Sequence, residues 1–430
     1  MSDKAPKILI ATLGTRGDVQ PYVALAKALC ERGATVTVST GEGFETMIEK
    51  AGARARPVPI DFKNLLQSED VQNALHSLRG MIKAARKNMA LQKDIARALW
   101  EIGLEEKPDL ILFNLKATVM TFVGRRLNIP AIPTSLQPVM APTTEFPLPL
   151  FGLPDLGPRM NRWSYTIGHA LMRFGTGKLA KPLKDVAGAE ISQPGDQMFG
   201  FLPDGGKTPI LQAFSQALVP TPADWPEQNW SCGYWLTDPE TDFEAPFDLL
   251  AFLDAGSPPV YLGFGSMTSQ DPEGLSRTVL AALETTGQRA ILATGWGGLS
   301  KQPLTGKLTN QVHLLERAPH SWLFPKCAAV VHHGGAGTTH EAVRWGVPSL
   351  VTPVFGDQPF WGARIHAIGA GPAPIRQKKL TPDTLASALR DLERPDYKAG
   401  AKKAADLIAS EPGARGTAEK LLRYLGDQCG

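Results

Sequence analysis

Short apolar runs alternate along the chain with longer segments in which apolar residues recur at every third or fourth position. The runs are rich in Val, Ile and Leu, which is typical of parallel β-strands covered on both faces. They predict strands at residues 7–12, 35–39, 109–114 and 131–135, and a second series at 260–266, 290–294, 312–315, 328–331 and 349–352.

The segments between these runs predict helices. Pro21 suits the first turn of a helix that follows the first strand, and Gly33 suits its end. Residues 71–102 place apolar residues at helical spacing with basic residues between them. This basic helix either rests on an anionic membrane or presents an ordinary solvated face. Strands that alternate with helices predict an open parallel sheet.

Two such series predict an α/β fold with two Rossmann-like domains that face each other across a cleft. The length of 430 residues also suits two domains. Acidic residues and prolines mark the linker between the two series. We expect an N-terminal domain at 1–237, a linker at 238–259, a C-terminal domain at 260–412 and a final helix at 413–430.

Composition excludes several classes of protein. The formal net charge of +3 is too small to favour a nucleic-acid partner. Four widely scattered cysteines show neither metal spacing nor a disulfide framework, and the first residues lack the apolar region of a signal peptide. We therefore expect a cytoplasmic protein. Peripheral membrane contact and the oligomeric state stay open.

Residues 331–361 combine a strand end, a glycine-rich turn, a helix, a second strand and a polar loop. Glycines let a backbone approach a diphosphate closely, and a helix N-terminus favours negative charge. This segment can therefore hold a nucleotide sugar. The candidates are His333, Gly335 and Gly337 for the turn, Thr338 and Thr339 for the phosphates, Glu341 for the ribose, and Asp357 and Gln358 for the sugar.

Other interpretations of this segment remain. The glycines can form a tight strand-to-helix turn that the threonines merely cap. Gly335 and Gly337 are followed by His340, which does not fit the dinucleotide fingerprint, and a P-loop Lys is missing. His332, His333 and His340 suggest a metal site, but acidic or Cys ligands at suitable spacing are missing. We expect no metal and no cofactor besides the donor substrate.

Two parts of this segment resemble a known motif. His332–Thr339 (His-His-Gly-Gly-Ala-Gly-Thr-Thr) and Phe355–Gly362 (Phe-Gly-Asp-Gln-Pro-Phe-Trp-Gly) resemble the donor-binding motif of family 1 glycosyltransferases with the GT-B fold. This version is most similar to the sterol 3-β-glucosyltransferases. Gly14–Pro21 (Gly-Thr-Arg-Gly-Asp-Val-Gln-Pro) is similar to the N-terminal signature of that family, and residues 218–225 and 260–266 also match.

The resemblance implies a GT-B fold and a UDP-glucose donor that is bound mainly by the C-terminal domain. It implies that His333 and the 335–339 turn hold the diphosphate, that Ser266 reaches a phosphate from the facing loop, and that Glu341 binds the ribose. It also implies that the final helix crosses back to the N-terminal domain.

The base-binding segment departs from the plant enzymes of the family. Arg317–His320 stands where those enzymes carry Trp-Ala-Pro-Gln, so the stacking Trp is absent. His320 and the backbone of Ala318 are then the expected contacts to the base and the ribose, and the choice between UDP and TDP stays open. Thr15 and Arg16 of the N-terminal signature are further expected donor contacts.

Asp18 follows the first strand and would face the cleft. Sugar transfer to a hydroxyl needs a base, and a carboxylate near a helix N-terminus stays ionised, although position alone also allows a simple helix cap. In bacterial relatives with Gly-[Ser/Thr]-Arg-Gly-Asp this Asp is the proposed base. Plant natural-product enzymes use a His, and no His lies between Met1 and Lys50 here. The resemblance therefore implies that Asp18 is the base of an inverting, metal-independent transfer.

The acceptor is expected on the N-terminal domain. Residues 138–157 are rich in Pro, Phe and Leu, and residues 163–174 add Tyr165, Leu171 and Met172. These residues either line an apolar pocket for a sterol or another flat, hydrophobic alcohol, or pack as ordinary core.

Four functions remain in competition. The favoured one is glucosyl transfer from UDP-glucose to a sterol-like alcohol. The acceptor can instead be a flavonoid, a macrolide or another secondary metabolite, with a TDP-sugar as donor. A nucleotide-sugar epimerase would need acid and base groups inside the sugar site and no apolar acceptor pocket. A non-catalytic sugar-nucleotide sensor would not need Asp18.

Overall fold

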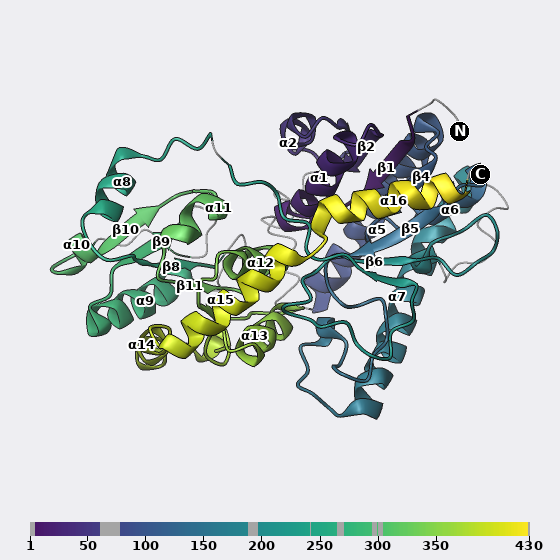
Figure 1. The fold of residues 1–430 in the computed structure, drawn as a ribbon. Helices are drawn as coiled ribbons and strands as arrows, with labels where there is room; N and C mark the ends of the chain where they lie inside the picture. Colours follow the sequence, from purple (N-terminus) through teal and green to yellow (C-terminus); the bar gives the residue numbers. More distant parts are fainter. Residues whose placement is uncertain are drawn as a thin grey trace.

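The computed structural model describes residues 5–60, 78–187, 197–240, 242–264, 271–294, 299 and 304–428. The chain forms two lobes, each built on a parallel sheet with helices around it (Figure 1). Within the described residues the N-terminal lobe has a seven-stranded sheet in the order β3-β2-β1-β4-β5-β6-β7. The C-terminal lobe has a five-stranded sheet in the order β10-β9-β8-β11-β12. The predicted fold class is confirmed.

The N-terminal lobe alternates strands and helices over its first half. Its strands are β1 (Lys7–Ala11), β2 (Thr35–Thr40), β3 (Arg54–Pro57), β4 (Leu110–Phe113), β5 (Ala131–Ser135), β6 (Ile210–Gln212) and β7 (Asn229–Ser231). Its helices are α1 (Arg16–Cys30), α2 (Glu45–Lys50), α5 (Leu78–Glu106), α6 (Met120–Leu127) and α7 (Pro158–Ala187), with short 3₁₀ turns at Pro149–Phe151 and Gln197–Phe199.

The C-terminal lobe repeats this plan. Its strands are β8 (Val260–Gly263), β9 (Ala290–Ala293), β10 (Val312–Leu315), β11 (Ala329–His332) and β12 (Ser349–Val351). Its helices are α8 (Phe247–Asp254), α9 (Pro272–Thr286), α10 (Leu308–Gln311), α11 (His320–Leu323), α12 (Ala336–Arg344), α13 (Gln358–Ala367), α14 (Pro382–Asp391) and α15 (Pro395–Ser410).

The central strands are apolar because both of their faces are covered. In β1, Ile8 and Ile10 pack with α1 on one face, whereas Leu9 and Ala11 pack with α5 and α6 on the other. All four side chains are buried. This period of two places successive side chains in different cores, which is why the run shows no alternation with polar residues.

The last helix, α16 (Gly413–Gln428), lies on the N-terminal lobe although it follows the C-terminal one (Figure 1). Its Ala418 and Leu421 are buried in the core that α1 and β1 share. The Trp235 indole Nε1 donates to Thr417 Oγ1 at 3.0 Å and ties the chain just before the expected linker to the same helix. The boundaries expected at residues 237 and 259 stay predictions.

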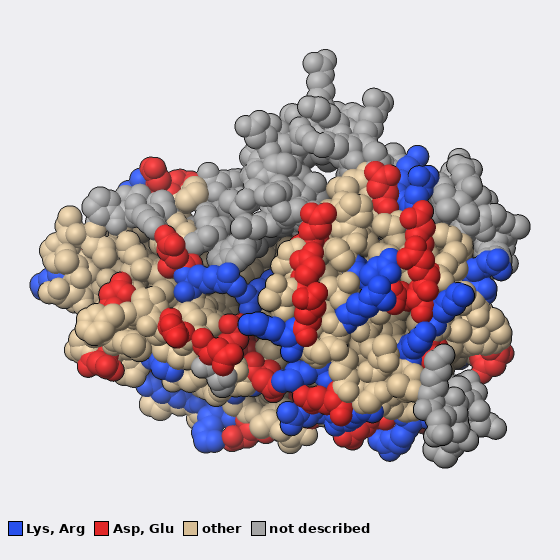
Figure 2. Space-filling model, turned by 90° about the horizontal axis from the view of Figure 1, so that it is seen from above, with Lys and Arg blue, Asp and Glu red and all other residues tan. Residues whose placement is uncertain are grey.

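The surface carries charges of both signs. On the face seen in Figure 2, Lys and Arg alternate with Asp and Glu, which accords with the net charge of +3. No helix within the described ranges is both long enough and apolar enough to span a bilayer.

Candidate functional site

The N-terminal lobe contributes the turn between β1 and α1. Thr15 is the N-cap of α1, and its backbone N–H donates to Asp18 Oδ2 at 2.9 Å. The Thr15 hydroxyl donates to the same oxygen at 3.3 Å. Asp18 is thus the third helical residue of a capping box. Gly14 has φ of +142°, and a Cβ there would lie 2.1 Å from Asp18 Oδ2, so only glycine lets the carboxylate approach this turn.

This start of α1 corrects the expectation that Pro21 opens the helix. The helix begins at Arg16, five residues earlier, because Thr15 and Asp18 supply the cap. Pro21 lies inside the helix and has no N–H, so the carbonyl of Gly17 cannot receive the usual helical hydrogen bond. The capping role for Asp18 is therefore real, and it leaves the second carboxylate oxygen for another partner.

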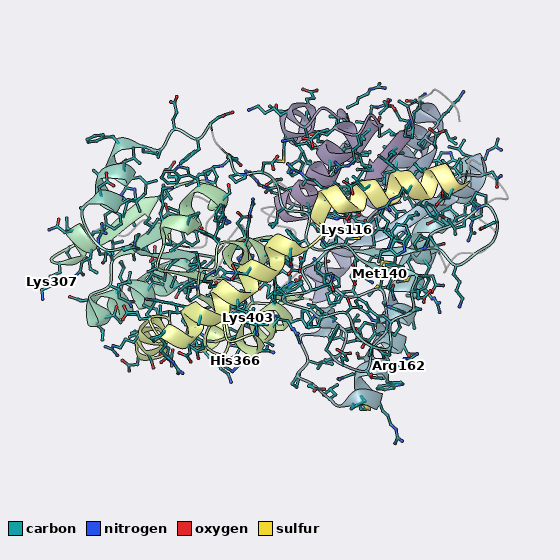
Figure 3. All side chains as sticks on the ribbon, viewed as in Figure 1. Lys116, Met140, Arg162, Lys307, His366 and Lys403 are labelled. Carbon is teal, nitrogen blue, oxygen red and sulfur yellow. The ribbon has the colours of Figure 1, made fainter. Side chains whose placement is uncertain are left out.

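That partner is Lys116, which the sequence analysis missed. Lys116 Nζ lies 2.9 Å from Asp18 Oδ1, with the Lys side chain 54% exposed and the Asp side chain 23% exposed. Lys116 follows β4, and β4 is the neighbour of β1 in the parallel sheet. The carboxyl ends of adjacent parallel strands meet at one edge, so the strand order carries the signal that would have found it. Figure 3 labels this lysine near the junction of the lobes.

The C-terminal lobe contributes the turn between β11 and α12. Gly334 has φ of +92°, and a Cβ there would lie 2.9 Å from the backbone oxygen of Gln358. A Cβ on Gly335, the N-cap of α12, would lie 2.6 Å from His333 Nε2. The N-cap residue Gly335 has no side chain with which to cap the first turn of α12. The first backbone N–H groups of α12 therefore receive no acceptor from its N-cap residue.

The histidines beside this turn are neutral. Burial lowers the pKa of His333 to about 4. Its Nδ1 is buried and has no hydrogen-bond partner in the part of the chain that the structure describes. Burial also lowers the pKa of His332, whose Nδ1 accepts from the backbone N–H of Gly334 at 3.1 Å. Neutral imidazoles can donate to a phosphate oxygen from one nitrogen without a counter-ion.

The two lobes meet at the first turns of α1 and α12. A Cβ on Gly337 would lie 3.3 Å from Tyr234 Oη and 4.0 Å from the Cα of Gly17. Tyr234 is buried and stacks on His340 with the ring centroids 3.9 Å apart. Sequence reasoning did not single out Tyr234, because its neighbours show no periodic pattern. These contacts bring the predicted N-terminal and C-terminal site segments together.

His340 fastens the same junction from inside α12. Its Nε2 accepts from the backbone N–H of Ser215, in the N-terminal lobe, at 3.1 Å. Its Nδ1 lies 2.6 Å from the carbonyl oxygen of Ala336, so Nδ1 carries the proton. Burial lowers the pKa of His340 to about 3, which fits a neutral ring with one donor and one acceptor.

The other residues of α12 that are predicted to contact the donor substrate differ in exposure. Thr338 is half-buried at the first turn, whereas Thr339 is buried and donates its hydroxyl to the carbonyl oxygen of Gly335 at 2.9 Å. Glu341 accepts from the Trp345 indole Nε1 at 2.7 Å and lies 3.5 Å from Arg344 Nη1. Burial raises the pKa of Glu341. Thr339 therefore serves the helix itself, while Thr338 and Glu341 stay available as predicted ligand contacts.

Asp357 and Gln358 begin α13. Asp357 Oδ2 accepts from the Trp361 indole Nε1 at 2.8 Å, and burial, with a further contribution from Asp18, raises the Asp357 pKa. Gln358 Oε1 accepts from the backbone N–H of Val354 at 2.7 Å. Gln358 is thus partly used to shape the loop before it.

The segment expected to hold the nucleotide base contains His320 and Ala318. His320 lies against Phe324 with ring centroids 4.4 Å apart, and its Nε2 is 3.3 Å from Tyr261 Oη. Burial first, then the charge of Arg16, lowers the His320 pKa to about 4. Ala318 is half-buried just before it.

Arg16 and Ser266 are two further residues that were predicted to contact the donor substrate. Arg16 Nη2 pairs with Glu240 Oε1 at 2.9 Å, which joins α1 to the linker region. Ser266 lies outside the described residues, as do residues 71–77 of the expected basic helix.

The histidines of this region do not gather around a common point. The rings of His332 and His333 are 6.5 Å apart and nearly perpendicular. Across the described ranges, no group of three or more His, Cys, Asp or Glu side chains could hold a metal ion.

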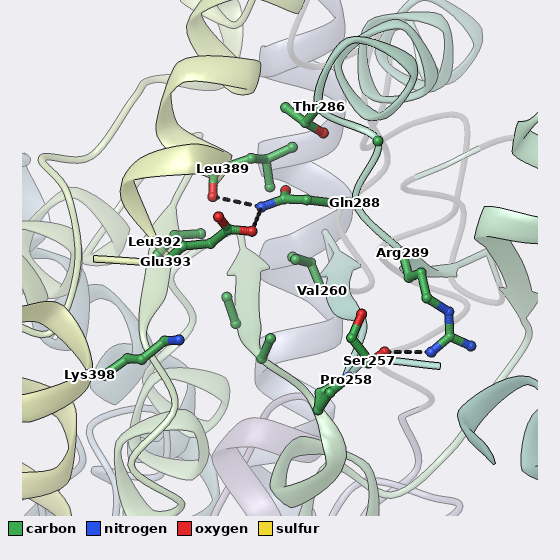
Figure 4. A pocket seen from close by; sticks show the side chains of 13 residues that line it. Ser257, Pro258, Val260, Thr286, Gln288, Arg289, Leu389, Leu392, Glu393 and Lys398 are labelled. Atoms are coloured by element: carbon green, nitrogen blue, oxygen red, sulfur yellow. Dashed lines mark hydrogen bonds between the residues drawn. The ribbon is translucent and has the colours of Figure 1, made fainter. Parts of the chain in front are cut away.

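A cavity of about 260 Å³ lies elsewhere in the C-terminal lobe (Figure 4). It is lined by Ser257 and Val260 at the start of β8 and by Gln288, which donates to Leu389 O at 3.1 Å and to Glu393 Oε1 at 2.6 Å. Parallel sheets bind ligands at the carboxyl ends of their strands, and this cavity lies at the amino end. It does not belong to the candidate site.

Comparisons with known proteins identify the families and structures that this chain resembles. Residues 8–144 match the glycosyltransferase family 28 N-terminal domain. Residues 290–423 match the erythromycin biosynthesis protein CIII-like C-terminal domain. Two sterol 3-beta-glucosyltransferases of Arabidopsis thaliana are 34% and 33% identical over 97% of this chain, which spans 66% and 68% of their lengths. A sterol 3-beta-glucosyltransferase of Emericella nidulans is 31% identical, and the chain spans 30% of it.

Solved structures share the fold at lower identity. The glycosyltransferase of kitacinnamycin superposes with a TM-score of 0.71 and 18% identity over 98% of this chain and 99% of that one. The calicheamicin glycosyltransferase CalG4 gives 0.68 and 19% over 99% and 100%.

The buried His340 predicts a pH dependence of stability. Its pKa is about 3 in the fold against 6.5 ordinarily, so an unfolded chain gains a proton that the fold does not as the pH falls below about 6.5. The contribution of this group to the free energy of unfolding is fully present above pH 6.5. It decreases by about 1.4 kcal/mol for each unit that the pH falls below 6.5. Between pH 6.5 and 5, the free energy of unfolding measured with urea should decrease less steeply with falling pH for His340→Gln than for the wild type. Parallel slopes would contradict the buried, neutral ring.

Proposed function

The chain belongs to the GT-B glycosyltransferases that include the sterol 3-beta-glucosyltransferases, and from this we propose that it transfers glucose from UDP-glucose to the hydroxyl of a sterol or similar polycyclic alcohol. One observation carries the proposal. The uncapped first turn of α12, which is a ready anion site, lies against the turn that holds the Asp18 carboxylate. A diphosphate on one helix and a base on the other can hold a reacting sugar between them.

The donor half of the reaction depends on α12. The first-turn N–H groups of α12, the Thr338 hydroxyl and the neutral His333 would bind the diphosphate, and Ser266 would add a hydroxyl from the facing loop. As the bond to the sugar breaks, negative charge grows on the departing UDP. Preorganised donors and the helix dipole stabilise that charge without a metal. Glu341, Ala318 and His320 would hold the ribose and base, and Asp357 and Gln358 the sugar.

The acceptor half depends on Asp18. One of its oxygens is held by Thr15, which orients the carboxylate, and the other faces Lys116. An acceptor hydroxyl at the second oxygen would pass its proton to Asp18 late, as its own oxygen bonds to the anomeric carbon. Lys116 would position the carboxylate and release it to the acceptor. A single displacement of this kind inverts the α-linked donor to a β-glucoside.

The region expected to bind the acceptor contains a buried apolar cluster. Met140, Leu148 and Tyr165 are buried together in one cluster, and Tyr165 Oη donates to the carbonyl oxygen of Pro138 at 3.1 Å. These inner side chains support the acceptor surface by packing. Leu171, which was expected either to line a pocket or to pack as core, is 60% exposed on α7.

Three alternatives have separate tests. A panel of sterols, flavonoids and macrolides with UDP-glucose and a TDP-sugar, analysed by mass spectrometry, separates the acceptors and donors. An epimerase would convert the donor alone into its epimer. A sensor would bind UDP-glucose without turnover and would tolerate the loss of Asp18.

Replacement of Asp18 by Asn should abolish most of the turnover. The amide cannot accept the acceptor's proton, so kcat should fall by about 10²-fold or more while UDP affinity stays the same. Asp396→Asn is the matched control, since the Asp396 side chain is 58% exposed on α15 and pairs with Arg394 at 2.7 Å. Full activity of Asp18→Asn would remove the proposed base.

Replacement of His333 by Ala should weaken UDP binding about tenfold or more, because a hydrogen bond to a charged phosphate contributes about 1.5–3 kcal/mol. Titration calorimetry with UDP measures this directly. His366→Ala, on α13 at the outside of the same lobe (Figure 3), is the control. Equal UDP affinity of His333→Ala and the wild type would place the diphosphate elsewhere.

A further inference from the structure

Residues 237–240, at the start of the expected linker, are fastened to one face of α1. The side chains on α1 are spaced by four and by seven positions, so they point to the same side of the helix. Three pairs make this attachment: Thr237 Oγ1 with Gln20 Nε2 at 3.0 Å, Asp238 Oδ2 with Lys27 Nζ at 2.6 Å and Glu240 Oε1 with Arg16 Nη2 at 2.9 Å. The segment therefore follows the helix that carries Asp18.

Arg344 reaches the same segment from the C-terminal lobe. It lies in the last turn of α12, and its Nη1 donates to the carbonyl oxygen of Thr237 at 2.8 Å. Thr237 thus contacts both lobes, because its hydroxyl accepts from Gln20 and its carbonyl oxygen accepts from Arg344. These two hydrogen bonds join the last turn of α12 to α1 through a single residue.

The same guanidinium holds Glu341, the residue expected to bind the ribose. Arg344 Nη1 lies 3.5 Å from Glu341 Oε1, and the two side chains are only 20% and 13% exposed. The Trp345 indole Nε1 donates to the same oxygen at 2.7 Å, and Arg344 Cζ lies 5.1 Å from the centroid of the Trp345 ring. Glu341 Oε2 takes no part in these contacts. The carboxylate is therefore held by one oxygen, which leaves the other oxygen to face a ligand.

Arginine suits this double task better than other cations. Its guanidinium carries several N–H donors in one rigid plane, so it can serve a carbonyl and a carboxylate together and still stack on an indole. Its charge also supports the ionised form of its neighbour. Burial raises the pKa of Glu341, and the charge of Arg344 opposes that rise. An ionised carboxylate is the stronger acceptor for the hydroxyls of a ribose.

We propose that Arg344 is a positioning residue, which orients Glu341 toward the ribose of the donor and ties this contact, through Thr237, to the helix that carries Asp18. Arg344 acts through these two residues rather than on the donor itself. The inference rests on the proposed function and deepens it, because recognition of a ribonucleotide donor then depends on the contact that sets the spacing of the lobes. That spacing matters, since a misplacement of about 1 Å can lower the rate by roughly 10²-fold.

Titration calorimetry with UDP and with 2′-deoxy-UDP tests the ribose half without any need for activity. The wild type should prefer UDP, because only UDP offers the 2′-hydroxyl to Glu341. Arg344→Met should weaken UDP binding about fivefold or more and 2′-deoxy-UDP binding by about twofold at most. Arg344→Lys, which keeps the charge, should retain more of the preference than Arg344→Met. Arg390→Met is the matched control, since Arg390 lies in the last turn of α14 and also donates to a carbonyl outside its own helix, that of Thr285, at 3.5 Å.

Steady-state kinetics with UDP-glucose and cholesterol test the connection to α1. Thr237→Val removes the hydroxyl that accepts from Gln20 and keeps the carbonyl that Arg344 uses. Its kcat should fall about threefold to fivefold while its affinity for UDP stays the same. Arg344→Met should lose in both kcat and UDP affinity. Thr285→Val, at an exposed threonine whose hydroxyl donates to Ala281 O within α9, should keep the wild-type kcat.

The outcomes separate this role from the proposed function. Circular dichroism shows that each variant is folded. An equal loss of affinity for UDP and 2′-deoxy-UDP in Arg344→Met, or no loss at all, would overturn the role at the ribose. A wild-type kcat in Thr237→Val would overturn the connection to α1. Glucosyl transfer by a wild type that binds both nucleotides equally would keep the proposed function and overturn the role of Arg344. A UDP preference that Arg344→Met loses, without any transfer by the wild type, would overturn the proposed function and keep Arg344 at the ribose.

Discussion

The first turns of α1 and α12 come from different lobes and meet at glycines, with a Cβ on Gly337 only 4.0 Å from Gly17 Cα. Each helix N-terminus carries roughly half a positive charge, so two of them in contact repel unless an anion lies nearby. The Asp18 carboxylate accepts from the N-cap N–H of α1, whereas the N-cap residue of α12 is Gly335, which has no side chain. A diphosphate would supply the missing acceptor and negative charge at the N-terminus of α12. The candidate site is organised around this difference between the two helix N-termini.

The junction needs support from outside the two turns. Tyr234 stacks on His340, and His340 accepts from Ser215 N in the N-terminal lobe. At the crossover into α16, Glu411 Oε1 accepts from Ser215 Oγ at 2.7 Å. Burial raises the pKa of Glu411. Ser215 is therefore held both by His340 of the C-terminal lobe and by Glu411 at the crossover.

Much of this arrangement could be predicted from the sequence, for physical reasons. Strands such as 109–114 and 131–135 are buried on both faces, so their apolar runs mark them directly. Short strands such as β7 carry mixed residues and were missed. Pairs such as Lys116 with Asp18, and Tyr234 with Gly337, join residues far apart in the chain. Only the order of strands and the meeting of the lobes brings them together, and no local pattern encodes that.

The most direct measurement is a crystal structure of the protein with UDP bound. The diphosphate should accept hydrogen bonds from the first turn of α12, beside His333 and Gly337, with the uracil toward His320 and the Asp18 carboxylate facing the phosphates across the junction of the lobes. UDP in the cavity near Gln288, or anywhere away from the first turn of α12, would contradict the account.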